Sequence, residues 1–127
     1  MKPHITEAEL QVLKILWEQG PSHVKSVHER LNKKKHTGYT TTLKIMQIMA
    51  QKALLSVDKS ARQHVYTPIL EQQEVQKSRL SRFLENTFGG SASSLVMQLL
   101  SHEDLTEKEL QEIKACINTL ENDDLGK

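Results

Sequence analysis

Apolar residues recur at helical spacing from the start of the chain, and the first stretch carries a signal for a helix N-terminus. Leu10, Leu13 and Trp17 share one helical face. Just before them, Thr6 is followed three positions later by Glu9, with apolar residues flanking the pair. This is the pattern of a capping box with a hydrophobic staple, so we predict a helix that begins after Thr6.

A second, shorter helix is predicted after a break. The Gly-Pro pair at 20–21 ends the first helix, and Ser22 is placed to cap the next one. Its apolar residues, again at helical spacing, are Val24, Val27 and Leu31. The polar run 32–35 ends it.

The third predicted helix, 39–52, combines an apolar stripe with an unusual beginning. Its inward residues are Leu43, Met46, and Met49 or Ala50. The first four positions, 39–42, hold a tyrosine and three threonines. These are poor residues for a helix interior but good hydrogen-bonding groups for phosphates or base edges, so they suit an exposed helix N-terminus that faces a ligand.

A β-hairpin is predicted after the third helix. Residues 55–57 and 64–67 alternate between apolar and polar side chains around a polar, basic tip at 58–63. Pro68 is expected to end the second strand, because proline cannot donate to the ladder.

The rear of the chain is predicted to be helical. A helix over 71–88 ends at Gly89-Gly90, a short helix follows over 91–100, and Thr106 with Glu109 repeats the capping box before a last helix. Narrow apolar stripes on so few residues cannot bury much surface alone, so we expect a second copy to cover them. The expected dimerisation residues are Phe83, Leu84, Phe88, Leu95, Val96, Leu99, Leu110, Ile113, Ile117 and Leu120.

This order of elements predicts a fold that is mainly α with a small β-hairpin wing. Three helices followed by a basic hairpin are typical of a winged helix-turn-helix. We therefore expect a DNA-binding domain over 1–70 and a C-terminal helical dimerisation region over 71–127.

The charge of the chain changes sign at the same boundary. The formal net charge is only +1 over 127 residues. Residues 1–70 hold 11 Lys or Arg against 5 Asp or Glu, a net +6, and residues 71–127 hold 6 against 11, a net −5. The basic half suits a polyanion that the acidic half would repel, so the two halves are expected to do different jobs.

The composition also bears on compartment. A single cysteine, Cys116, forms neither an internal disulfide nor a thiolate metal cluster. No secretory signal and no apolar run of roughly 18 residues is present, so we expect a cytoplasmic protein without membrane insertion.

Duplex DNA is the expected partner, and the residue types suggest how contacts divide. Hydroxyls and longer polar side chains on the third helix suit base edges and phosphates, while cations at the hairpin tip suit phosphates. The predicted DNA-binding residues are Tyr39, Thr40, Thr41, Thr42, Lys44, Gln47, Lys59 and Arg62, with Lys33 to Lys35 as further phosphate contacts.

Plainer interpretations of these residues stay open at this point. The threonines can simply cap the third helix, Tyr39 can be a core aromatic, and the lysine run 33–35 can be a solvated loop. A winged helix can also serve as a protein-interaction adaptor without operator binding, with the acidic tail docking a partner. A duplex affinity that falls steeply with salt separates DNA binding from that alternative.

Enzymatic and metal functions find no support in the residues. The six histidines are His4, His23, His28, His36, His64 and His102, and their spacing gives no tetrahedral ligand set. No nucleophile elbow, phosphate-binding glycine loop or HExxH motif occurs. We expect neither catalysis, nor a cofactor, nor a metal site.

The chain resembles the penicillinase repressor (BlaI/MecI) family over nearly its whole length. The resemblance rests on two stretches, residues 5–10 followed by Leu16-Trp17 and the stretch that runs from 39–41 to 51–55. In the tail it rests on the segments 88–91, 94–96, 103–106 and 109–110. It implies a homodimeric repressor on a palindromic operator, with the third helix in the major groove.

The resemblance also implies a route of release, and the chain differs from the family pattern at three places. A membrane sensor-protease cuts the best-known members in the dimerisation region, at an Asn-Phe bond. This bond aligns with Gln98-Leu99 here, and the Asn-Phe pair of the family is therefore absent from this chain. The lone Cys116 cannot reproduce the paired cysteines of the copper-responsive branch. Ala53 stands where the family commonly has glycine, and it costs roughly 1 kcal/mol if the position is left-handed.

Overall fold

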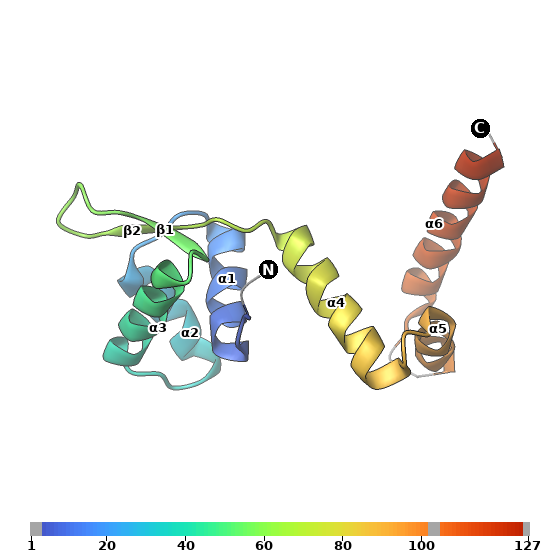
Figure 1. The fold of residues 1–127 in the computed structure, drawn as a ribbon, viewed down its shortest axis with the longest axis horizontal. Helices are drawn as coiled ribbons and strands as arrows, with labels where there is room; N and C mark the ends of the chain where they lie inside the picture. Colours follow the sequence, from blue (N-terminus) through green and yellow to red (C-terminus); the bar gives the residue numbers. More distant parts are fainter. Residues whose placement is uncertain (1–3, 102–104, 126–127) are drawn as a thin grey trace. The chain divides into compact units, whose positions relative to one another are not determined.

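The computed structural model describes residues 4–101 and 105–125. In chain order the elements are α1 (Glu7–Gln19), α2 (Val24–Lys34), α3 (Tyr39–Gln51), β1 (Leu55–Asp58), β2 (Val65–Pro68), α4 (Gln72–Phe88), α5 (Ala92–Ser101) and α6 (Glu107–Leu125) (Figure 1). The predicted fold, mainly helical with one hairpin, is confirmed. No helix in the described ranges is long and apolar enough to cross a membrane.

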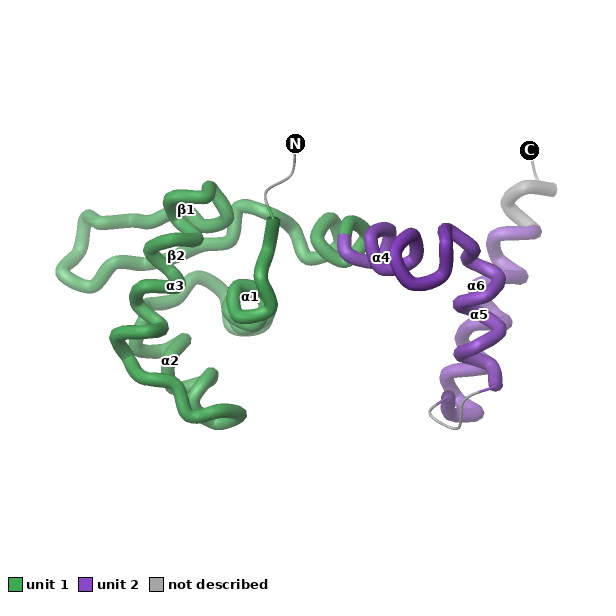
Figure 2. Tube along the Cα trace, turned by 60° about the horizontal axis from the view of Figure 1, so that its bottom comes forward, with its two compact units in different colours: residues 1–78 green, residues 79–127 purple. Residues whose placement is uncertain are grey.

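The chain forms two compact units, residues 1–78 and 79–127 (Figure 2). The division falls inside α4, beyond the boundary at 70/71 that the charge pattern suggested. The functional limits of 1–70 and 71–127 stay a prediction.

The first helix begins as its sequence predicts. The backbone N–H of Glu9 donates to the Thr6 hydroxyl at 3.2 Å, and the Glu9 carboxylate accepts from the backbone N–H of Thr6 at 3.0 Å. Both partners of the capping box are therefore present, and each satisfies a donor that the helix itself cannot.

One hydrophobic core holds the first unit together. It takes side chains from α1, α2, α3 and the hairpin, and those that are almost fully buried are Val12, Leu13, Leu16, Val27, Met46, Met49, Leu54 and Leu55. The two methionines were predicted core residues, and this is confirmed. Because α3 is fixed by this packing, its opposite face is held out to solvent on a rigid support.

Ser22 does not cap α2, so that prediction is wrong. The N-cap of α2 is His23, which makes no side-chain cap bond. Ser22 pairs instead with β2, because its N–H donates to the Tyr66 carbonyl at 3.1 Å and its carbonyl accepts from the Tyr66 N–H at 2.9 Å. Its hydroxyl donates to the Gly20 carbonyl at 2.8 Å. This bridge ties the start of α2 to the wing.

The wing is a two-stranded antiparallel hairpin. Leu55 pairs with Pro68 and Asp58 with Val65, which leaves residues 59–64 as the tip. Leu55 and Tyr66 are buried and anchor the strands to the helices, while the tip is exposed.

An ion pair joins the start of α1 to the end of α3. The Lys52 ammonium donates to both carboxylate oxygens of Glu9, at 2.8 and 2.9 Å, and the Glu9 side chain is 6% exposed. Burial alone raises the pKa of Glu9, but the bonds from Lys52 and Thr6 outweigh it and hold this pKa below its ordinary value of 4.5.

Glu9→Gln should therefore cost about 1.5 kcal/mol of unfolding free energy near neutral pH, since hydrogen bonds to charged groups are worth about that much. A carboxyl with a lowered folded-state pKa adds stability above its unfolded value, and this is lost as pH falls through the lower value. Urea unfolding across pH should show the wild type losing its advantage below about 4.5. An equal pH dependence in Glu9→Gln would contradict the role of the pair.

Ala53 follows α3 and has a φ of 62°. Among the residues that the structure describes, it is the only one other than glycine with a positive φ. The sequence left open whether this position is left-handed, and it is. Its N–H donates to the Ala50 carbonyl at 3.1 Å, which turns the chain from α3 into β1.

Ala53→Gly should stabilise the protein by about 1 kcal/mol, because glycine adopts positive φ without the Cβ clash. Urea unfolding at one protein concentration measures it. Ala50→Gly, inside α3, is the matched control and should destabilise instead. A loss of stability in both variants would show that the positive φ at 53 carries no strain.

The second unit is built of helices with well-formed ends. Gly89 and Gly90 have positive φ, and the Gly90 N–H donates to the Leu84 carbonyl at 3.0 Å, which closes α4. The predicted second capping box is confirmed, because the Glu109 N–H donates to the Thr106 hydroxyl at 3.1 Å and the Thr106 N–H donates to Glu109 Oε1 at 3.3 Å. None of the side chains described in this unit is buried.

Candidate nucleic-acid interface

The outward face of α3 carries most of the predicted contact residues. Thr40, Thr41, Lys44 and Gln47 are all exposed. They recur at helical spacing on the side away from Met46 and Met49, so one rigid surface presents hydroxyl, ammonium and amide groups together. Ile48, 39% exposed, belongs to the same surface and was not predicted.

Thr42 is a correction to the predicted contact set. It is fully buried, and its hydroxyl donates to the Gly38 carbonyl at 3.4 Å and lies 3.4 Å from His28 Nδ1. Positions 42, 46 and 49 form the inner stripe, rather than one that starts at Leu43. A DNA contact by Thr42 is therefore excluded, and the i, i+4, i+7 spacing was the signal that could have revealed it.

Tyr39 is not the core aromatic that the sequence allowed. It is 48% exposed, and its ring makes a T-shaped contact with the His28 ring at a centroid distance of 5.6 Å. This contact holds the tyrosine at the first turn of α3 and leaves part of it available to a ligand.

The wing tip is basic and locally ordered. Lys59 and Arg62 are exposed there. The Ser60 N–H donates to the Asp58 carboxylate at 2.9 Å, and hydrogen bonds from the side chain and backbone of Ser60 lower the pKa of Asp58. This turn fixes the strand end from which the two cations project.

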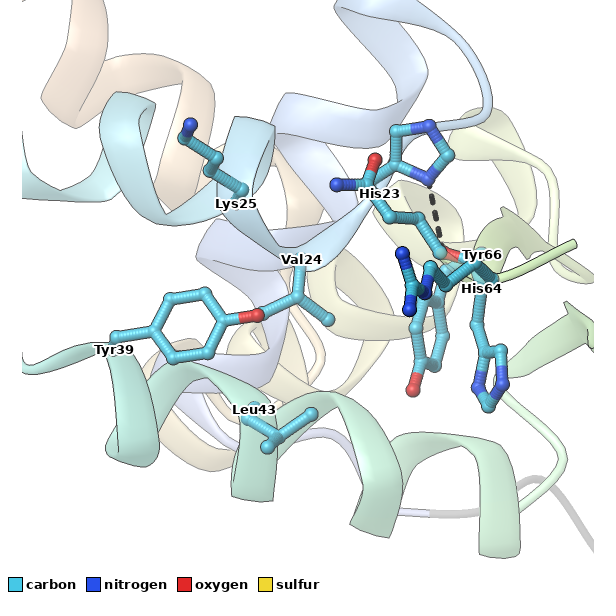
Figure 3. Close-up of a pocket in the computed structure, with 9 residues that line it drawn as sticks. His23, Val24, Lys25, Tyr39, Leu43, His64 and Tyr66 are labelled. Carbon is cyan, nitrogen blue, oxygen red and sulfur yellow. Dashed lines mark hydrogen bonds between the residues drawn. The ribbon is translucent and has the colours of Figure 1, made fainter.

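A cavity of about 210 Å³ lies where α2, α3 and the wing meet (Figure 3). It adds the N-cap residue His23, Lys25 from α2 and His64 from the wing to the predicted residues Tyr39 and Arg62. Sequence reasoning missed these three residues, because the wing meets the start of α2 only in the folded chain. The His23 Nδ1–H donates to the carbonyl of His64, 41 positions away, at 3.2 Å. The cavity therefore brings together Lys25 from α2 and Arg62 from the wing.

The histidines do not assemble into a metal site in the part of the chain that the structure describes, where no three His, Cys, Asp or Glu side chains converge. His102 lies outside the described residues. His23 and His28 are engaged with the wing and with Tyr39 respectively.

Known proteins share both the sequence pattern and this fold. The family profile described as penicillinase repressor matches residues 5–119. The chain belongs to the penicillinase repressor family. This confirms the resemblance noted from the sequence, and it makes the chain a winged-helix regulator of the repressor class rather than a member of an enzyme family.

Individual members of the penicillinase repressor family align along more than nine-tenths of the chain. The penicillinase repressor of Bacillus licheniformis is 25% identical over 120 residues, covering 94% of each chain. That of Staphylococcus aureus is 22% identical over 116 residues, covering 91% of this chain and 92% of the relative. Sequence similarity therefore spans both units.

Solved structures of this family match the first part of the chain. The solution structure of the DNA-binding domain of the repressor BlaI has a TM-score of 0.52 and 27% identity, covering 58% of this chain and 90% of that one. The monomeric form of Bacillus licheniformis BlaI in complex with the blaP half-operator has a TM-score of 0.51 at the same identity and coverage.

The C-terminal unit of this penicillinase repressor family member presents the predicted dimerisation residues to solvent. Five are exposed in the single chain, with fractions from 43% to 60%: Phe83, Val96, Leu99, Ile117 and Leu120. The other five are half-buried: Leu84, Phe88, Leu95, Leu110 and Ile113. Met97, 65% exposed, adds an apolar side chain that was not predicted.

Proposed function

We propose that this protein is a homodimeric transcriptional repressor that binds a palindromic operator sequence-specifically in the cytoplasm. The observation that carries the proposal is the exposed polar face of α3 beside the basic wing tip and the start of α2. A BlaI relative is described in complex with a half-operator, and its fold matches this part of the chain.

The contacts divide by chemistry. Thr40, Thr41, Lys44 and Gln47 enter the major groove with α3 and read base edges, with the methyl groups of threonine available to thymine methyls. Phosphates are bound by Tyr39, by the lysine run 33–35, and by Lys59 and Arg62 on the wing. Lys25 joins this set because it lines the cavity together with Arg62. Phosphate contacts set affinity and register, while α3 sets selectivity.

Dimerisation is expected because the described residues of the second unit form no buried core. Among the described residues from 79 onward no side chain is buried, which leaves large apolar surfaces in water. A second copy of the chain, related by two-fold symmetry, covers the apolar surfaces of both subunits at once. Two identical domains then require two inverted half-sites, which makes the operator palindromic.

Release is proposed to occur by proteolysis of the dimerisation region. Gln98 and Leu99 lie in α5, and both are exposed in the single chain. A cut there by a membrane sensor-protease would separate α6 from the rest of the apolar surface and weaken the dimer. Because Gln-Leu replaces the Asn-Phe pair, the protease that makes this cut needs a different side-chain preference.

A fluorescence anisotropy titration tests the function. The probe is labelled duplex from the region upstream of the gene, with random duplex as competitor and the salt concentration varied. We expect a complex of two subunits that survives excess competitor, with log affinity falling by about 0.9 per neutralised phosphate per decade of salt. Salt-insensitive or absent binding to a panel of genomic duplexes would overturn the proposal in favour of a protein-interaction adaptor.

A further inference from the structure

A groove of about 620 Å³ lies on the first unit, apart from the cavity beside the wing. Three segments form it: the start of α1, the end of α2 with the turn that follows, and the first half of α3. Each helix contributes one apolar side chain to the lining, namely Ala8, Leu31 and Ile45. Leu31 and Ile45 pack against the core and remain partly exposed, so the groove has a fixed apolar floor.

The rim of the groove on the α2 side is cationic. Lys34, Lys35 and His36 line it, and all three are exposed. Among the described residues neither lysine forms an ion pair, so both ammonium groups are available to a ligand. Glu7 lies on the α1 side of the groove, where it already has an interaction of its own. The lysines that line the groove therefore come from one segment, the end of α2 with the turn that follows it.

We propose that this groove binds a small organic anion with an apolar body and a single carboxylate. The apolar body lies against Ala8, Leu31 and Ile45, and the carboxylate is bound by Lys34 and Lys35. The volume fits the range of roughly 300–1,000 Å³ that small-molecule sites occupy. Charge complementarity selects the anion over a neutral or cationic molecule of the same shape, because the two lysines have no carboxylate partner within the described residues.

The ligand acts as an inducer, a step that rests on the proposed function. Thr41 lines the groove and is also a proposed base contact, while Lys34 and Lys35 are proposed phosphate contacts. A carboxylate held by the lysines occupies groups that the DNA backbone needs. Anion and DNA therefore compete, and each lowers the affinity of the other by the same factor.

Binding is tested on the full chain with 2-naphthoate, followed by amide NMR. We expect saturable shifts at Ala8, Gly38, Thr41 and Ile45, and binding about tenfold weaker after Lys34→Gln with Lys35→Gln. Lys14→Gln, an exposed lysine of α1 outside the groove, is the matched control and should bind normally. Equal affinity for neutral 2-naphthalenemethanol, or shifts confined to the apolar faces of α4 to α6, would overturn the site.

Coupling to DNA is tested with Ala8→Phe, which fills the groove and leaves every proposed DNA contact unchanged. Saturating 2-naphthoate should weaken duplex binding about tenfold in the wild type and not in Ala8→Phe. Binding of 2-naphthoate without this effect overturns the inducer role. If the wild type binds 2-naphthoate but no duplex, the proposed function is wrong and the groove remains a ligand site. If it binds duplex but not 2-naphthoate, only the groove proposal is wrong.

Discussion

Leu120→Asp should turn the dimer into monomers, with a dimer dissociation constant raised by about 100-fold or more. Leu120 is 60% exposed in the single chain and belongs to the apolar stripe of α6. A carboxylate at a surface that a second copy covers must be desolvated without a partner, which costs about 3 kcal/mol, and each 1.4 kcal/mol is about a factor of ten. Operator affinity should fall with it, because each domain then binds one half-site alone. Sedimentation equilibrium and anisotropy measure the two effects.

Gln111→Asp is the matched control for this prediction. Gln111 is exposed on the same helix but lies on the side opposite the stripe that contains Leu110 and Ile113. It adds the same charge, so a general electrostatic effect on dimer or DNA would appear in both variants. A dimer of normal strength in Leu120→Asp would show that this face of α6 lies outside the interface.

Lys44→Ala and Thr41→Ala should each weaken specific DNA binding by about 10- to 100-fold, while non-specific binding falls much less. Both side chains are exposed on the outward face of α3. A good base contact discriminates against the wrong base by about 1–3 kcal/mol, whereas the phosphate term is common to all sequences. Affinities for the operator duplex and for random duplex at one salt concentration give the ratio for each variant.

Arg62→Ala is the comparison variant that distinguishes contacts with base edges from contacts with phosphates. Arg62 lies at the exposed wing tip and lines the cavity beside α2 and α3. Its removal should weaken specific and non-specific binding alike and reduce the salt slope by about one phosphate equivalent. Equal losses of specificity in Lys44→Ala, Thr41→Ala and Arg62→Ala would contradict the division of roles.

Signals within a few residues of each other predicted the local structure well. Both capping boxes form at Thr6 and Thr106, because their hydrogen bonds close over three residues and need no distant partner. The pair at 89–90 ends α4, since only glycine adopts two successive positive φ values without strain. The polar tip, predicted at 58–63, lies at 59–64 between the paired strands for the same local reason.

Predictions failed where a distant segment competes for the same atoms. Ser22 has the chemistry of an N-cap, but its backbone bonds to Tyr66, 44 positions away, take the chain into the sheet. Thr42 has the chemistry of a base contact, but the packing of α3 against α2 rotates it to the core, beside His28. Side-chain type alone cannot reveal which of two possible partners a residue has.

The sequence by itself determined the order of helices and strands, the basic front half, and the apolar stripes that the second unit leaves uncovered. Each of these depends on spacing along the chain and on the sum of charges, which need no coordinates. Only the tertiary structure decided that Thr42 of α3 faces the core, that His23 meets His64, and that segments of three helices enclose a groove lined by two lysines. The reason is physical: packing fixes the rotation of each helix, and that rotation determines which of its side chains water, a ligand or DNA can reach.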